Sequence, residues 1–248
     1  MGRRGGDKIF QKEKEKKKID FKRITNNKNM VEDIIIACED SVSSPTYFKM
    51  IIEKLIEAKK ITQDSIVIVP HDSSTHPTGV LKNLKSYINN YGKTYKKFKH
   101  KWIIIDRDIE MVKGGGHTAE DFNNALKNAK SSKSNLNVEV AYINDSFELW
   151  YLLHFEYRNT AISRDEIVKQ VIKKLKNIEP HKFAKLNKDN IKQESYTKHI
   201  FETLKPLQSI AIQNATKLLA SYGDNHNPER DNPSTTIHLL VMIMNRLS

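Results

Sequence analysis

Two short, continuous apolar runs that end on acidic residues constrain the fold of this chain more than any other feature. The first run, Val31–Ala37, is followed closely by Glu39. The second, Trp102–Ile105, is followed directly by Asp106 and then by Asp108. Isoleucine-rich runs of this length, bounded by polar residues, are typical of strands that are buried on both faces of a parallel sheet.

The acidic residues after these two runs are expected to lie together. Parallel strands end at the same edge of a sheet, and polar residues just beyond those ends share a crevice. Glu39, Asp106 and Asp108 should therefore converge although they are far apart in the sequence. Neighbouring carboxylates repel one another unless they share a cation, and hard oxygen ligands favour Mg²⁺ or Mn²⁺. The sequence predicts a site for one of these ions at this edge.

Strand and helix signals alternate through the first part of the chain. Further strands are expected at Ser65–Val69 and Val138–Ile143, and helices at Tyr47–Lys59, Val80–Tyr91 and Ala119–Lys130. This alternation predicts an α/β fold with a mainly parallel sheet flanked by helices.

The pattern changes after residue 160, where only amphipathic or apolar helical segments are evident and no further strand is expected. We predict a basic tail over residues 1–28, flexible or helical, and an α/β domain over residues 29–160. Residues 161–248 should form a helical region packed on the sheet. The expected helices of this region are Arg164–Leu175, Lys198–Leu204, Leu207–Ala220 and Thr235–Leu247.

Helix-start chemistry is present at two places. Ser44 is expected to cap the helix that follows the first strand, with Pro45 at its first position. Thr118 is expected to cap the helix that follows the third strand.

The charge balance favours a polyanionic partner. The chain has 42 Lys and Arg against 30 Asp and Glu, a formal net charge of +12. Such an excess favours nucleic acid. Part of it lies in the tail of residues 1–28, so a lysine-rich solubilising surface is the alternative interpretation.

Several classes of protein are excluded or disfavoured. Cys38 is the single cysteine, so an intramolecular disulfide and a cysteine-based zinc site cannot form. No apolar run approaches the roughly 20 residues that span a bilayer, and the N-terminus lacks a signal-peptide core, so we expect a cytoplasmic protein with no membrane partner. The Gly114–Gly116 run matches neither common phosphate-binding glycine motif, so a nucleotide cradle is not expected.

Five further residues are candidates for the site. Glu148 follows the fourth strand and is expected to act as a further metal ligand or base, with a position in the core as the alternative. Arg107 and Lys198 are candidates to bind the scissile phosphate. The alternatives are that Arg107 points away and pairs with surface acids, and that Lys198 is solvated. His71 and His76 lie in the loop after the second strand and are candidate substrate contacts.

A glutamate after the first strand and an Asp-x-Asp after a later strand resemble the Toprim fold of topoisomerases, bacterial primases and OLD-family nucleases. The resemblance implies acid/base chemistry or metal binding for Glu39, and divalent ions held by Asp106 and Asp108. This sequence departs from the pattern at Asp40, where the family usually has glycine. The departure puts the tight turn in doubt and adds a fourth carboxylate.

The chain resembles RloB-family proteins more closely, in blocks that span nearly its whole length in order. This resemblance implies a Toprim-type protein encoded near bacterial defence genes, often beside a restriction system or an AAA- or ABC-type ATPase. The matching blocks are Cys38-Glu39, Ser44–Phe48, Asp106–Asp108, Asn144–Phe155 and Asn232–Thr236.

The leading hypothesis is a Mg²⁺- or Mn²⁺-dependent endonuclease that acts as a toxic effector in anti-phage defence. Asp106 and Asp108 would hold one or two ions, with Glu39 as ligand or general base. Expected partners are RNA, tRNA included, or DNA, together with the ATPase; a homo-oligomer is compatible with the sequence. The alternative is a non-catalytic sensor or adaptor module for that ATPase. A nucleotidyl transferase would need a nucleotide site that the sequence does not reveal.

Overall fold

A computed structural model of the chain describes residues 33–72, 76–108 and 117–247. The basic tail expected over residues 1–28 and the Gly114–Gly116 run lie outside the described residues, as does the start of the first expected strand at Val31.

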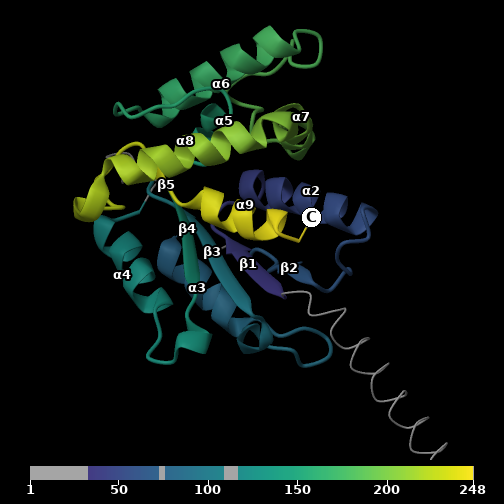
Figure 1. Cartoon of the computed structure of the whole chain (residues 1–248), viewed down its shortest axis with the longest axis vertical. Helices are drawn as coiled ribbons and strands as arrows, with labels where there is room; N and C mark the ends of the chain where they lie inside the picture. Colours follow the sequence, from purple (N-terminus) through teal and green to yellow (C-terminus); the bar gives the residue numbers. More distant parts are fainter. Residues whose placement is uncertain (1–32, 73–75, 109–116, 248) are drawn as a thin grey trace, which may run out of the picture. The chain divides into compact units, whose positions relative to one another are not determined.

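The described residues form a five-stranded sheet of order β2-β1-β3-β4-β5 (Figure 1). The first four strands run parallel, and β5 is antiparallel to β4. The predicted fold class, a mainly parallel α/β sheet flanked by helices, is confirmed and is consistent with a Toprim-like fold. The strands are β1 (Ile34–Cys38), β2 (Ile66–Ile68), β3 (His100–Asp106), β4 (Glu139–Asn144) and β5 (Ser234–Thr235).

Helices cover both faces of the sheet. The chain moves from β1 to β2 in one direction and then back past β1 to β3, so right-handed crossovers place α2 on one face and α3 and α4 on the other. Figure 1 shows this arrangement. The helices of the α/β part are α2 (Ser43–Glu57), α3 (Pro77–Ser86), α4 (Ala119–Ala129) and α5 (Glu148–Leu153).

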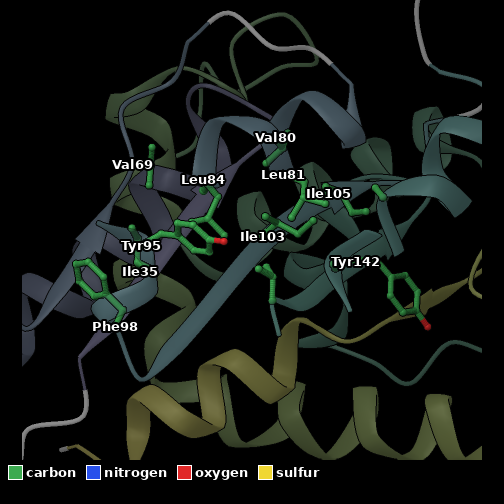
Figure 2. Packing of buried hydrophobic residues seen from close by; sticks show 14 of the residues in the cluster. Ile35, Val69, Val80, Leu81, Leu84, Tyr95, Phe98, Ile103, Ile105 and Tyr142 are labelled. Atoms are coloured by element: carbon green, nitrogen blue, oxygen red, sulfur yellow. The ribbon is translucent and has the colours of Figure 1, made fainter. Parts of the chain in front are cut away.

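The isoleucine runs are continuous because each central strand is buried on both sides. Ile35 of β1 and Ile103 of β3 belong to a cluster that includes side chains of α3 and α4, part of which is drawn in Figure 2. Successive side chains of a strand point to opposite faces, so Ile34 and Ile104 face the other way. These four isoleucines are at most 1% exposed.

Each helix of the C-terminal part packs on a different element of the α/β part or shares one with a neighbour. Helix α9 packs on β4, α6 and α8 pack on α5, and α7 packs on α2. Their bounds are α6 (Arg164–Ile178), α7 (Glu194–Leu204), α8 (Gln208–Ser221) and α9 (Ile237–Asn245). No helix in the described ranges is long and apolar enough to cross a membrane.

The short strand β5 was not expected, because the sequence analysis predicted no strand after residue 160. It extends the sheet through hydrogen bonds to β4, and Thr236 continues the contact by donating its N–H to the Tyr142 carbonyl at 3.0 Å. A strand of two residues is too short to show a period-two pattern, so sequence reasoning had no signal for it.

The cap predicted at Ser44 is wrong. Helix α2 begins at Ser43, and the acceptor at its start is the carboxylate of Asp40. That carboxylate accepts hydrogen bonds from the N–H groups of Val42 at 3.0 Å and Ser44 at 3.1 Å, and the Ser44 hydroxyl also donates to it. Pro45 therefore occupies the third helical position rather than the first. The cap predicted at Thr118 is confirmed, since its hydroxyl accepts from Asp121 N–H at 3.1 Å.

Replacing Asp40 with alanine should lower the free energy of unfolding by about 1–2 kcal/mol, because the first N–H groups of α2 lose their acceptor. Asp40→Asn keeps a carbonyl acceptor and should lose less. Urea unfolding followed by circular dichroism measures both, with the exposed Asp64→Ala as control. Equal stability of Asp40→Ala and wild type would show that the carboxylate does not hold the start of α2.

Candidate active site

Acidic residues follow three adjacent parallel strands at the same edge of the sheet. Glu39 follows β1, Asp106 ends β3 with Asp108 close behind it, and Asp145 follows β4. The chain leaves β1 toward α2 on one face and leaves β3 toward α4 on the other. The edge between β1 and β3 is therefore the switch point at which open α/β sheets form a ligand crevice.

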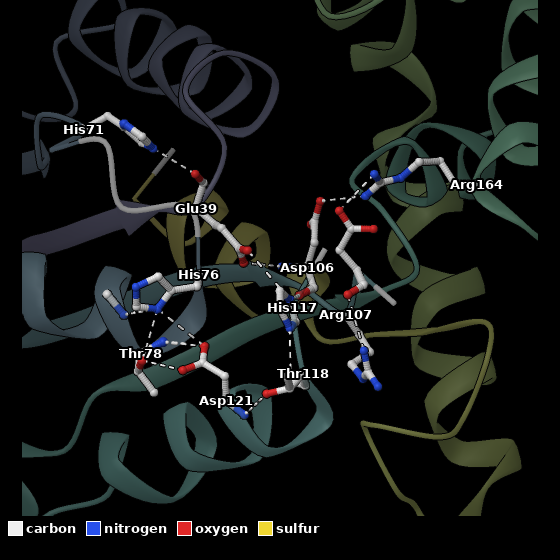
Figure 3. A network of polar contacts seen from close by, with 12 residues as sticks. Glu39, His71, His76, Thr78, Asp106, Arg107, His117, Thr118, Asp121 and Arg164 are labelled. Carbon is white, nitrogen blue, oxygen red and sulfur yellow. Dashed lines mark hydrogen bonds and ion pairs between the residues drawn. The ribbon is translucent and has the colours of Figure 1, made fainter. Parts of the chain in front are cut away.

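The side chain of Glu39 joins the ends of β1 and β3. Its Oε2 accepts a hydrogen bond from the backbone N–H of Asp106 at 3.0 Å (Figure 3). Its Oε1 lies 3.7 Å from Nε2 of His117, and the side chain is only 12% exposed. The structure thus brings together the ends of the two isoleucine runs, as the sequence predicted.

Asp106 and Asp108 share one cation of the protein itself. The Arg164 guanidinium places Nη1 3.0 Å from Oδ2 of Asp108 and Nη2 3.9 Å from Oδ2 of Asp106 (Figure 3). Arg164 is the first residue of α6, and its backbone N–H donates to Oδ2 of Asp145 at 3.3 Å. The start of α6 is therefore docked against the acidic edge.

The electrostatics of the edge favour added positive charge. Burial, together with the nearby Asp106 and Asp108, raises the pKa of Glu39 from 4.5 to about 9. Burial and then Asp40 raise the pKa of Asp106 well above its usual range, although Lys192 and Arg164 oppose this shift. Both carboxyl groups are thus destabilised in their charged form, and an additional cation between them would reverse that effect.

Glu148 lies deeper in the same region. Its side chain is 0% exposed, and neither carboxylate oxygen has a hydrogen-bond partner among the described residues. Lys192 reaches to 3.7 Å from its Oε1. Glu148 contributes to the raised pKa of Asp106, which places it within electrostatic range of the crevice.

Among the described residues, neither of the two predicted phosphate-binding cations forms an ion pair with Glu39, Asp106 or Asp108. Arg107 is buried and turns toward the loop before β5, where its Nη2 pairs with Oε1 of Glu229 at 3.0 Å. This matches the alternative in which Arg107 points away from the crevice. Lys198 lies on α7 and pairs with Glu194 one turn earlier, at 2.7 Å.

The two histidines predicted as substrate contacts have different positions. His71 lies at the edge, with Nε2 2.9 Å from the carbonyl oxygen of Glu39. His76 instead caps α3: its Nδ1 accepts from Gly79 N–H at 3.2 Å and lies 3.6 Å from Oδ2 of Asp121. Dashed lines in Figure 3 link His76 to the group of Thr78 and Asp121, and none links it to Glu39.

Three residues at the edge were missed by the sequence analysis: Arg164, Lys192 and His117. The ring of His117 stacks on Phe122, and its Nε2 donates to the Asp106 carbonyl at 2.6 Å. Arg164 and Lys192 come from the helical part of the chain, more than fifty positions after Asp106 and Asp108. No local spacing links them to the strand ends, so only the tertiary fold identifies them.

The donor chemistry at this edge fits a divalent cation, but the conformation does not form a complete ligand cluster. In the part of the chain that the structure describes, no group of three or more His, Cys, Asp or Glu side chains is arranged to hold a metal ion. The residues that could hold Mg²⁺ or Mn²⁺ are Asp106, Asp108 and Glu39, whose oxygens are the hard ligands these ions prefer. In the structure, Arg164 supplies the positive charge at Asp106 and Asp108.

Fold and site together describe an α/β protein with acidic residues gathered at the carboxyl edge of a parallel sheet. A family model described as RloB-like protein matches residues 34–244, which is most of the chain. The chain therefore belongs to the RloB-like family, as its sequence blocks predicted. Neither a comparison with curated proteins nor one with solved structures gives a match.

The raised pKa of Glu39 predicts how the stability of the cation-free protein depends on pH. Between pH 4.5 and about 9 the unfolded chain has lost the Glu39 proton while the folded chain keeps it, so this group lowers stability as the pH rises. Glu39→Gln removes that penalty. In EDTA, the melting temperature of the variant should be higher than that of wild type at pH 8 and close to it at pH 4.5. The difference at pH 8 should be about 2–4 °C for each kcal/mol of unfolding free energy regained.

Differential scanning fluorimetry across this pH range measures the effect. The control is Glu120→Gln, which neutralises an exposed acid in the first turn of α4. A constant difference between Glu39→Gln and wild type at every pH would contradict the prediction.

Proposed function

We propose that this protein is a Mg²⁺- or Mn²⁺-dependent nuclease that hydrolyses phosphodiester bonds in RNA, tRNA included, or in DNA. Its biological role would be that of an effector in bacterial anti-phage defence. The observation that carries the proposal is the meeting of Glu39 with the end of β3 at the carboxyl edge, beside Asp106 and Asp108. Burial and mutual repulsion at this edge favour an added cation.

In the proposed mechanism, Asp106 and Asp108 hold the cation and Glu39 takes the proton from the attacking water. When bound, a divalent ion polarises the phosphate and makes a coordinated water more acidic. Glu39 is placed for proton transfer because its carboxylate is buried at the strand ends, fixed by Asp106 N–H and close to His117. Lys192 adds positive charge near Asp106 and can stabilise negative charge that develops on phosphate oxygens.

The net charge and the family resemblance indicate which partners to expect. The net charge of +12 supports a polyanionic substrate that is gathered electrostatically. The resemblance to RloB-family proteins encoded beside defence ATPases supports an AAA- or ABC-type ATPase as a partner, in the cytoplasm. The Gly114–Gly116 run matches neither common phosphate-binding glycine motif, so we assign any ATP dependence to that partner.

Asp106→Asn and Asp108→Asn should each reduce cleavage by about a hundredfold or more, because each removes a charged ligand from the reacting centre. Cleavage of tRNA, single-stranded RNA and DNA would be measured with Mg²⁺, with Mn²⁺ and with EDTA. Asp165→Asn, an exposed acid in the first turn of α6, is the matched control and should retain activity. Unchanged cleavage by both variants, or no cleavage of any substrate in either metal, would contradict the proposal.

Nucleic-acid binding should weaken steeply with salt. If phosphate contacts dominate, the logarithm of the association constant falls linearly with the logarithm of salt concentration, by about 0.7 per neutralised phosphate on a single strand. Fluorescence anisotropy of labelled RNA and DNA in EDTA, titrated at several salt concentrations, measures this slope. Binding that is insensitive to salt would show that the positive charge is not used to gather the substrate.

A non-catalytic sensor or adaptor for a defence ATPase is the second candidate. The observation that favours it is the Arg164 ion pair, which neutralises part of the acidic edge without a metal. An adaptor would bind the ATPase equally well as wild type or as Asp106→Asn, and would cleave no nucleic acid in any metal. Pull-down with the neighbouring ATPase, run beside the cleavage assay, separates the two functions.

A further inference from the structure

Arg164 is the cation that the described residues place on both aspartates of the edge. Its two terminal nitrogens lie 3.0 Å from Asp108 and 3.9 Å from Asp106. Asp106 and Asp108 belong to the end of β3, whereas Arg164 opens α6 in the helical part of the chain. The guanidinium therefore lies against the two aspartates that the proposed function takes as metal ligands.

Among the described residues, the ion pairs of the Arg164 side chain are those with Asp106 and Asp108. Its Nε is buried and has no hydrogen-bond partner among the described residues. Its backbone N–H donates separately to Asp145, and the start of α6 is capped by the Ser163 hydroxyl, which accepts from Glu166 N–H. The side chain is 26% exposed, so it has a path to solvent. It can leave the aspartates without unfolding α6, and water can then satisfy Nε.

A divalent ion held by Asp106 and Asp108 would lie beside this guanidinium, because Arg164 is near Oδ2 of both carboxylates. Two positive charges a few ångströms apart repel each other strongly in a partly buried site. This repulsion falls when the guanidinium moves away from Oδ2 of Asp108 as the ion binds. Binding of a metal ion then includes the free energy of breaking the Arg164 contacts.

We propose that Arg164 is an internal counter-ion that competes with the divalent cation for Asp106 and Asp108. The inference rests on the proposed function, because it takes these aspartates as metal ligands. Arg164 stabilises the acidic edge in the absence of metal and lowers its apparent affinity for metal. The site is therefore filled only when the ion is abundant enough to displace the side chain.

Calorimetric titration of the full-length protein with MnCl₂ tests this proposal. Arg164→Gln should bind Mn²⁺ about tenfold more tightly than wild type, because the competing cation is gone. Lys169→Gln is the matched control: it removes one positive charge from the same helix, at a side chain that is 75% exposed and pairs with Glu166. Its affinity should equal that of wild type.

Arg164→Lys provides a second test that keeps the charge and so protects the fold. A lysine cannot bridge both carboxylates in the forked manner of a guanidinium, so its Mn²⁺ affinity should lie between those of wild type and Arg164→Gln. If Arg164→Gln does not fold, as judged by circular dichroism, the lysine variant decides the question. Affinity equal to or weaker than wild type in the folded variants would overturn the competition.

Asp106→Asn in the same titration separates this inference from the nuclease proposal. Tighter binding by Arg164→Gln that disappears in the double variant with Asp106→Asn supports the competition, whether or not any nucleic acid is cleaved. Tighter Mn²⁺ binding by Arg164→Gln without cleavage of RNA or DNA would support the counter-ion proposal and overturn the nuclease proposal. Absence of Mn²⁺ binding in wild type and in Arg164→Gln would overturn the counter-ion and the metal ligands together.

Discussion

The parallel pairing of β1 with β3 is the constraint on which the rest of the structure depends. Its register sets Cys38 beside Ile104, and the N–H of Glu39 donates to the Ile104 carbonyl at 3.0 Å. Because side chains alternate along a strand, a slip of one residue would move each buried isoleucine to the opposite covered face and would shift Glu39 away from the Asp106 N–H. The packing of the core and the geometry of the acidic edge are therefore fixed by the same hydrogen-bond ladder.

The sequence was sufficient for features that arise from local pattern. Continuous isoleucine runs identified β1 and β3, and parallel topology was enough to place Glu39 and Asp106 at one edge. The sequence did not predict which partner a charged side chain takes when several partners lie far from it along the chain. Arg107 stands between two aspartates in the sequence yet pairs with Glu229, while Arg164 takes the position beside those aspartates. Such choices depend on how the helical part packs, which no spacing encodes.

The helical C-terminal part does more than cover the α/β part. It contributes the two cations that oppose the raised pKa of Asp106, one from the start of α6 and one from the segment before α7. At the same edge, the Asp40 carboxylate accepts from the N–H groups of α2, and its charge still raises the pKa of Asp106. The net negative charge at the crevice is smaller than the number of acidic residues in the sequence suggests, because Arg164 and Lys192 offset part of it.

Arg164 lies later in the sequence than all the acids at the strand ends, and this order matters during synthesis. A ribosome completes β1, β3 and β4 before it reaches residue 164, so the nascent α/β part carries its carboxylates without their guanidinium partner. Until α6 emerges and docks, dissolved cations or protons must balance that charge. The order of translation therefore makes the docking of α6 sensitive to the ionic composition around the growing chain.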